Sequence, residues 1–194
     1  LETHLGTIAD SGSLKFKNEN KLEEDNQIIG QFGVGFYSAF MVAKKVTVIS
    51  KAYGSDKAFQ WESEGVDGYT ITEADKKNVG TDIILELLDD TDDENYSDFL
   101  DQYRIKSLVK KYSDYIRFPV KMEMTHSRPK EVPEEEKDEN KAPEYEDYIE
   151  IETLNSMVPL WHKNKTELKE EDYKHFYTEK FYDYNEPLKH AHVK

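Results

Sequence analysis

Three glycines, Gly30, Gly33 and Gly35, stand within six residues of one another and are followed at once by an apolar run. Glycine has no Cβ, so this backbone can adopt positive φ angles and a ligand can approach its amides closely. Apolar residues at helical spacing from Phe36 to Ala43 predict a short helix after the loop. Unpaired amides in the loop and first helical turn, together with the helix dipole, can bind an anion such as a nucleotide phosphate.

The spacing of these glycines is G-x-x-G-x-G, which matches neither of the two common phosphate-binding loops. A Walker loop would end in Gly-Lys-Ser or Gly-Lys-Thr, and the dinucleotide fingerprint follows a strand. The alternative interpretation is a glycine-rich turn that packs a helix tightly against a sheet. Spacing alone leaves both interpretations open.

Composition limits the classes of protein and partner that need to be considered. The 194 residues are 37% hydrophobic and 35% charged, with a net charge of -15 and no cysteine. Basic residues occur in scattered pairs, so we expect no nucleic-acid partner. The lack of cysteine excludes disulfides and thiolate metal sites. The sequence has no apolar run of membrane-spanning length and no signal peptide at its start, so we expect a cytoplasmic protein without a membrane partner.

The pattern of apolar residues predicts an α+β fold with helices on one face of a mainly antiparallel sheet. A polar segment at 14–26, between a Ser-Gly-Ser hinge and the glycine loop, is placed where a mobile flap or an ordinary surface loop would lie. The expected elements are a helix ending near Ala9, the helix after the glycine loop, strands at 46–50, 58–61, 69–72 and 81–88 (the last one central), a helix at 103–116 on the sheet and a strand at 120–124. The composition of Tyr53-Gly54-Ser55-Asp56 is typical of a turn, so we expect the strands at 46–50 and 58–61 to form a hairpin.

Residues 127–149 change in character, because proline and acidic residues almost replace the apolar ones. Such a segment cannot bury enough surface to fold, which predicts a flexible linker between a first domain, 1–126, and the beginning of a second, 150–194. An acidic binding tail is the alternative, but ordered sequence resumes after it. The second part carries an aromatic stripe at helical spacing, Tyr173, Phe176, Tyr177 and Phe181. The start at Leu1 and the end soon after this stripe favour a fragment of a longer protein.

Several motifs of this chain resemble the ninety-kilodalton heat-shock chaperone family, most closely its bacterial high-temperature protein G branch. They occur in the order that is typical of that family over the whole chain apart from the linker. The motifs are Leu5-Gly6-Thr7-Ile8-Ala9-x-Ser11-Gly12, Ile29-Gly30-Gln31-Phe32-Gly33-Val34-Gly35-Phe36-Tyr37-Ser38, Trp61-Glu62-Ser63, Gly80-Thr81, Lys111-Tyr112-Ser113 and Pro159-Leu160-Trp161.

The resemblance implies the split (GHKL-type) ATP-binding fold, with ATP and Mg²⁺ on the helical side of the sheet. It implies that the backbone of Gly33, Val34, Gly35 and Phe36 caps the phosphates, and that 14–26 is the lid. Thr81 would place its hydroxyl near the adenine. Weaker nucleotide contacts are implied for Gln31 and for His4, which could equally be a surface histidine.

Two departures from the family bear on activity. Asp10 stands where members commonly carry a lysine that reaches the phosphates, and a carboxylate there would repel them. The catalytic glutamate, the metal-binding asparagine and the adenine-reading motif of the family are expected upstream of Leu1. We therefore assign no catalytic residue and no metal ligand in this chain.

The resemblance implies an ATP-driven chaperone that hydrolyses ATP to ADP and phosphate, acts on client proteins, works with co-chaperones and forms a homodimer at full length. We expect the isolated segment to be inactive. Two alternatives remain open. One is a nucleotide-independent interaction module, and the other is an ATPase of the same fold, such as a sensor kinase or a gyrase-like subunit.

Overall fold

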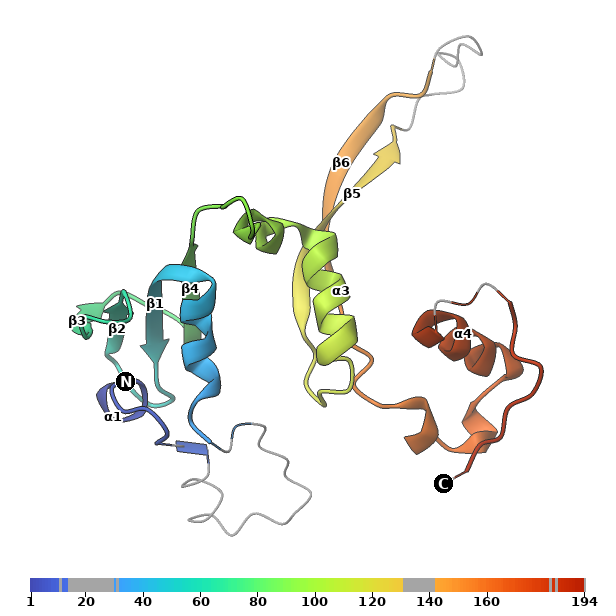
Figure 1. The fold of residues 1–194 in the computed structure, drawn as a ribbon, viewed down its shortest axis with the longest axis horizontal. Helices are drawn as coiled ribbons and strands as arrows, with labels where there is room; N and C mark the ends of the chain where they lie inside the picture. The colour runs from blue at the N-terminus through green and yellow to red at the C-terminus, as the bar shows by residue number, and fades with distance from the viewer. Residues whose placement is uncertain are drawn as a thin grey trace. The chain divides into compact units, whose positions relative to one another are not determined.

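The computed structural model describes residues 1–10, 12–13, 30, 32–130, 142–181, 183 and 185–193, in two compact units, Leu1–Asp98 and Phe99–Lys194 (Figure 1). The predicted lid at 14–26 and the predicted nucleotide contact Gln31 lie outside the described residues.

The first unit is built on a four-stranded antiparallel sheet in the order β3-β2-β1-β4. The strands are β1 (Ala43–Lys51), β2 (Ala58–Ser63), β3 (Thr70–Ala74) and β4 (Gly80–Leu87). The predicted hairpin of β1 and β2 is confirmed. The prediction that the strand at 81–88 is central is wrong, because β4 pairs only with β1 in the described part of the chain. A run of apolar residues indicates that both faces of a strand are apolar, but it does not indicate how many strands pair with that strand.

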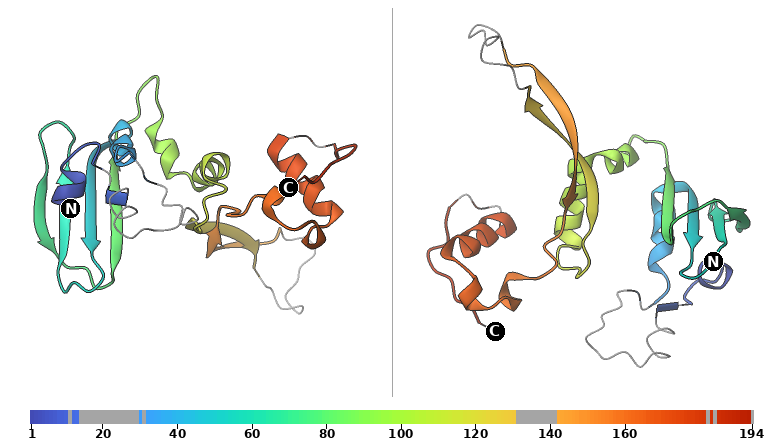
Figure 2. Two further views of the ribbon diagram at one scale, coloured as in Figure 1. Left: turned by 90° about the horizontal axis from the view of Figure 1, so that it is seen from below. Right: turned by 180° about the vertical axis from the view of Figure 1, so that it is seen from behind.

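Two short helical elements cover one face of this sheet, α1 (Glu2–Leu5) and the 3₁₀ helix η1 (Gly35–Met41) (Figure 2). Leu5, Phe36 and Phe40 pack against a core that contains Val48 and Trp61. The predicted α+β class, with helices on one face of an antiparallel sheet, is confirmed. Helix α1 is shorter than expected, since Gly6 already caps it, and the helix after the glycine loop is 3₁₀ rather than α.

The second unit contains a long two-stranded ribbon, β5 (Lys121–Pro129) and β6 (Tyr145–Thr153), with helix α3 (Gln102–Tyr112) beside it (Figures 1 and 2). Asp101 caps the start of α3 through the amide of Arg104. The side chain of Gln102 then bonds to both backbone groups of Thr125, which fixes the helix on the ribbon. The predicted helix at 103–116 is therefore present, although it ends four residues early and lies on β5 and β6.

The strands of the ribbon reach into both ends of the predicted linker. Residues 127–129 belong to β5 and 145–149 to β6, and Arg128 pairs with Glu146 across the ribbon. These two ends of the predicted linker are therefore paired strands, in which Arg128 and Glu146 are register partners. Residues 131–141 lie outside the described part, and the division into two domains stays a prediction.

The 3₁₀ turn η2 (Tyr96–Leu100) precedes α3 and spans the boundary between the two units. The last elements of the second unit are the 3₁₀ turns η4 (Leu160–His162) and η5 (Lys165–Glu167) and helix α4 (Glu170–Phe181). Helix α4 carries the predicted aromatic stripe. Tyr173 is buried and stacks on His190 with 4.0 Å between ring centroids, whereas Phe181 is 66% exposed. The stripe is therefore core at its beginning and surface at its end.

Candidate functional site

The glycine loop is fixed against the segment that follows α1. Gly33 has a φ of 67°, a left-handed conformation that favours glycine, and its carbonyl accepts a hydrogen bond of 3.3 Å from the amide of Ala9. The hydroxyl of Tyr37 donates to the carbonyl of Leu5 at 3.0 Å. These two contacts connect the loop and the first turn of η1 to residues that precede it by more than twenty positions.

The start of η1 leaves backbone amides without an acceptor in the helix itself. Gly35 and Phe36 begin this helix, so their N–H groups have no acceptor within it. A Cβ built on Gly35 would meet no heavy atom of the described residues within 4 Å. Among the described residues, nothing packs against the backbone at Gly35, whereas a glycine-rich turn that packs a helix tightly on a sheet would have close neighbours there.

Strand register places Thr81 toward the same end of the covered face as this loop. Phe36 contacts Trp61, with 5.6 Å between ring centroids, and Trp61 pairs with Val48 of β1. Two residues further along β1, Ser50 pairs with Thr81, and their hydroxyl oxygens lie 2.8 Å apart. Phe40, at the other end of η1, lies near Gly65, which follows β2. Helix η1 therefore begins toward the Ser50–Thr81 pair and runs away from it.

The residues around Thr81 belong to no motif in the sequence apart from Gly80. Ser50 gave no signal, because its partner is 31 residues away in sequence. The same face carries Ile83 and Phe59, which are 55% and 41% exposed. Apolar surface beside a pair of hydroxyls suits a planar, partly polar ring such as a nucleotide base.

Two further predicted contacts lie near the loop. Asp10 is half-buried and directly follows Ala9, whose amide bonds to Gly33. The ring of His4 lies over Gly12, since a Cβ on that glycine would come within 2.8 Å of it. Asp10 therefore lies one residue from the contact between Ala9 and the glycine loop, and His4 lies against Gly12.

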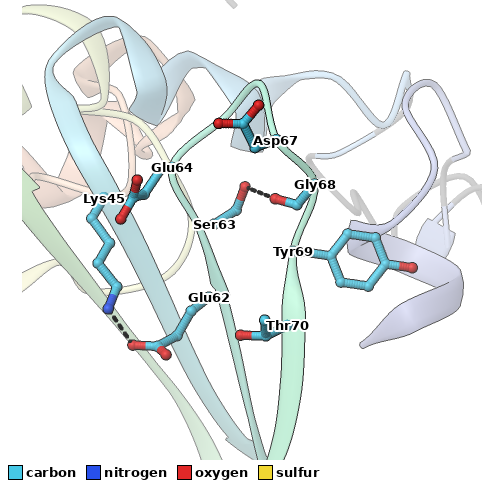
Figure 3. Close-up of a pocket in the computed structure, with 8 residues that line it drawn as sticks. All are labelled: Lys45, Glu62, Ser63, Glu64, Asp67, Gly68, Tyr69 and Thr70. Carbon is cyan, nitrogen blue, oxygen red and sulfur yellow. Dashed lines mark hydrogen bonds and ion pairs between the residues drawn. The ribbon is translucent and has the colours of Figure 1, made fainter.

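A hollow of about 230 Å³ at the turn between β2 and β3 has different chemistry (Figure 3). Its walls include Glu64 and Asp67, and Lys45 is paired with Glu62 at 2.8 Å. The hydrogen bond from Lys45 holds the pKa of Glu62 below its ordinary value. The hollow is acidic, and none of the predicted nucleotide contacts lines it, so we do not assign it to a phosphate ligand.

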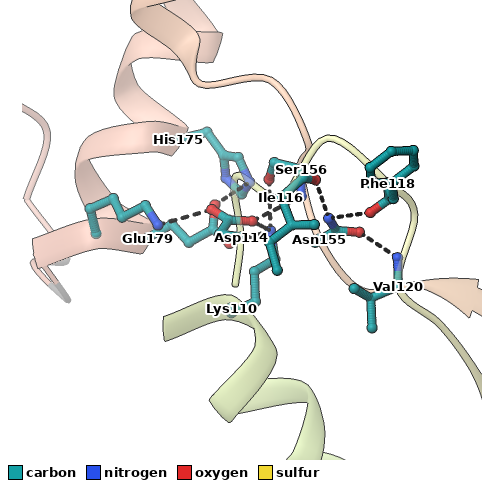
Figure 4. Close-up of polar contacts among 10 residues, drawn as sticks. Lys110, Asp114, Ile116, Phe118, Val120, Asn155, Ser156, His175 and Glu179 are labelled. Carbon is teal, nitrogen blue, oxygen red and sulfur yellow. Dashed lines mark hydrogen bonds and ion pairs between the residues drawn. The ribbon is translucent and has the colours of Figure 1, made fainter. Parts of the chain in front are cut away.

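A buried polar cluster in the second unit joins α3, the end of β6 and α4 (Figure 4). Asp114 is 5% exposed and accepts hydrogen bonds of 2.9 Å from the Lys180 side chain and from the Ser156 amide. Lys110 lies 3.4 Å from the same carboxylate. Burial by itself would raise the pKa of Asp114, but the hydrogen bonds from Lys180 and Ser156 outweigh it and hold that pKa below its ordinary value.

Asn155 completes this cluster from the neighbouring position (Figure 4). Its side-chain amide donates to the carbonyls of Ile116 and Phe118 at 2.8 and 3.0 Å, and its oxygen accepts from the Val120 amide at 2.8 Å. Every polar atom of this side chain is therefore used to hold the turn between α3 and β5. These contacts are structural, and they bring no nucleophile or general base to an open surface.

The described residues contain no group of three or more His, Asp or Glu side chains placed to hold a metal ion. No helix in the described part of the chain is long and apolar enough to cross a membrane.

Comparison with known proteins gives two family matches. Residues 98–148 and 141–194 match the family described as "Hsp90 protein", and residues 8–90 match "Histidine kinase-, DNA gyrase B-, and HSP90-like ATPase". Chaperone protein HtpG of Clostridium perfringens is 56% identical over 193 residues, and that of Bacillus subtilis is also 56% identical. The HtpG of Bacillus licheniformis is 58% identical. Each comparison covers 100% of this chain and 30% of the relative.

Proposed function

This chain belongs to the Hsp90 protein family, and from that premise we propose that it is part of an ATP-dependent molecular chaperone acting on unfolded or partly folded clients. The chain spans about a third of the length of the curated relatives that it matches. The activity of the whole protein is therefore a proposal that rests on the family and on the site.

The observation that carries the proposal is the common position of the glycine loop and Thr81 on the helix-covered face. In this proposal the amides of Gly33, Val34, Gly35 and Phe36 bind the phosphates of ATP, and the Thr81 hydroxyl binds near the adenine. The open backbone at Gly35 and the exposed Ile83 beside Thr81 support this division of roles. Gln31 and His4 are secondary candidates, and Asp10 weakens phosphate binding.

Hydrolysis needs more than these residues supply. ATP, when bound, provides the phosphoryl group, and its transfer to water requires an oriented water molecule and stabilisation of the developing charge. We assign no general base and no Mg²⁺ ligand to this chain. We accordingly propose that the protein hydrolyses ATP to ADP and phosphate at full length, while the 194 residues alone neither hydrolyse ATP nor bind it tightly.

The remaining features of the proposal follow from the family rather than from the site. They are a homodimer at full length, clients and co-chaperones as protein partners, a cytoplasmic location and a role in the stress response. The net charge of -15 and the absence of cysteine are compatible with that location, and the charge argues against a nucleic-acid partner.

A complementation experiment distinguishes this proposal from a nucleotide-independent interaction module. Gly35→Asp places a negative charge at the proposed phosphate site, and Gly35→Ala is the matched control that adds only a methyl group to open space. In cells that depend on the full-length protein, we expect the alanine variant to support chaperone activity and the aspartate variant to lose it. Activity that persists in the aspartate variant, at equal protein level, would favour the interaction module.

A further inference from the structure

We propose that Ser50 is a positioning residue for nucleotide binding, whose hydroxyl orients that of Thr81 toward the adenine. The inference rests on the proposed function and extends it to a residue with no motif of its own. The two side chains come from neighbouring strands, β1 and β4, and their oxygens lie 2.8 Å apart.

The placement of the pair is fixed by the sheet. Ser50 and Thr81 are register partners, and they share the face on which Val48, Trp61 and Phe36 form the core. Side chains alternate between the faces of a strand, so both hydroxyls point to the side covered by η1. They lie toward the end of the covered face at which η1 begins.

The chemistry of two adjacent hydroxyls explains how one can control the other. A hydroxyl has one donor hydrogen and two acceptor lone pairs, and the hydrogen rotates freely unless a partner holds it. If Ser50 donates, Thr81 keeps its own hydrogen for an acceptor on the ligand. If Thr81 donates, its lone pairs face a donor on the ligand. In either case Ser50 determines whether the Thr81 hydroxyl acts as a donor or as an acceptor toward the adenine ring.

A purely structural role for the pair is the competing explanation. The hydrogen bond is exposed to solvent, so water replaces it at little cost when one hydroxyl is removed. We therefore expect Ser50→Ala to leave folding intact, which allows binding to be measured separately from stability. Ser50→Thr keeps the hydroxyl and is the conservative control.

The test measures ATP binding to the full-length protein by calorimetric titration, with inorganic tripolyphosphate as a probe that lacks the base. Loss of one neutral hydrogen bond predicts that Ser50→Ala weakens ATP binding about 3- to 10-fold. Ser50→Thr should stay close to wild type. Tripolyphosphate affinity should not change in either variant. The double variant Ser50→Ala, Thr81→Ala should bind ATP no more weakly than Thr81→Ala alone, because Ser50 acts through Thr81.

Three results would count against the inference, and they are distinguishable. Unchanged ATP affinity in Ser50→Ala, while Thr81→Ala binds more weakly, overturns the role of Ser50 alone. An equal loss of tripolyphosphate and ATP affinity in Ser50→Ala shows general disruption of the site and also overturns it. If neither Thr81→Ala nor Gly35→Asp alters ATP affinity, the proposed function itself fails and the inference fails with it.

Discussion

Replacing Asp114 by asparagine removes the charge of the buried carboxylate that joins α3 to α4 while preserving its shape. Asparagine can still accept the hydrogen bond from the Ser156 amide. The variant loses the charge-assisted bond from Lys180 at 2.9 Å and the attraction to Lys110 at 3.4 Å. The change therefore isolates the ionic part of the cluster.

The expected loss of stability depends on how far the two lysine side chains are exposed to water. A charge-assisted hydrogen bond is worth about 1.5 to 3 kcal/mol, and a buried charge left without its partner costs about 3 to 5 kcal/mol. The side chains of Lys180 and Lys110 are 29% and 33% exposed, so both can turn toward water after the substitution. We expect Asp114→Asn to lower the free energy of unfolding by about 2 kcal/mol.

Urea unfolding measures this cost, and hydrogen exchange shows whether it is local to α4 and Ser156. Glu144→Gln, which breaks the exposed Lys130–Glu144 pair, is the matched control and should have no measurable effect. Since the folded pKa of Asp114 is lowered, its stabilisation is complete above the ordinary carboxyl pKa and is lost as pH falls through the folded value. The difference between wild type and variant should shrink in acid. Equal stability of the two variants at neutral pH would refute the reasoning.

Three further substitutions test other parts of the structure. Asn155→Ala should lower the free energy of unfolding in urea by about 2 to 3 kcal/mol, because it leaves buried backbone groups of the turn without partners. A decrease no larger than that of a substitution at an exposed position would contradict this role. Gly33→Ala should lower the free energy of unfolding by about 1 kcal/mol, because the φ of Gly33 is 67°. Gly35→Ala should leave thermal unfolding nearly unchanged. An equal decrease in stability for both variants would show that the loop adopts another conformation. Trp61→Ala should lower the free energy of unfolding by about 3 to 5 kcal/mol and remove the contribution of Trp61 to the near-ultraviolet circular dichroism, because Trp61 is 2% exposed; an unchanged spectrum in the tryptophan region would place the core elsewhere.

Local sequence patterns predicted much of the fold. The turn residues between β1 and β2 were sufficient to predict the hairpin, and the 3.6-residue period was sufficient to predict α3. The number of neighbours of β4 could not be predicted, because apolar residues on both faces of a strand say nothing about its edges. The early end of α1 depends on Gly6, whose capping the spacing of apolar residues did not show.

Only those residues of the candidate site that belong to a sequence motif could be predicted. The glycine loop is contiguous, so its chemistry could be inferred before its position was known. Ser50 became visible only through its pairing with Thr81, 31 residues away, and the Asp114–Lys180 contact joins residues 66 positions apart. Such contacts depend on register and packing, and neither residue of either pair carries a local signal that identifies its partner.

The central claim is that the backbone around Gly35 binds the phosphates of a nucleotide. Titration of ATP into the full-length wild-type protein, Gly35→Ala and Gly35→Asp tests it directly. A carboxylate about 5 Å from a phosphate oxygen, at an effective dielectric constant of about 20, is repelled by about 3 kcal/mol, or roughly a hundredfold in affinity. We predict near wild-type affinity for the alanine variant and a loss of at least about a hundredfold for the aspartate variant. Equal ATP affinity in all three proteins would contradict the claim.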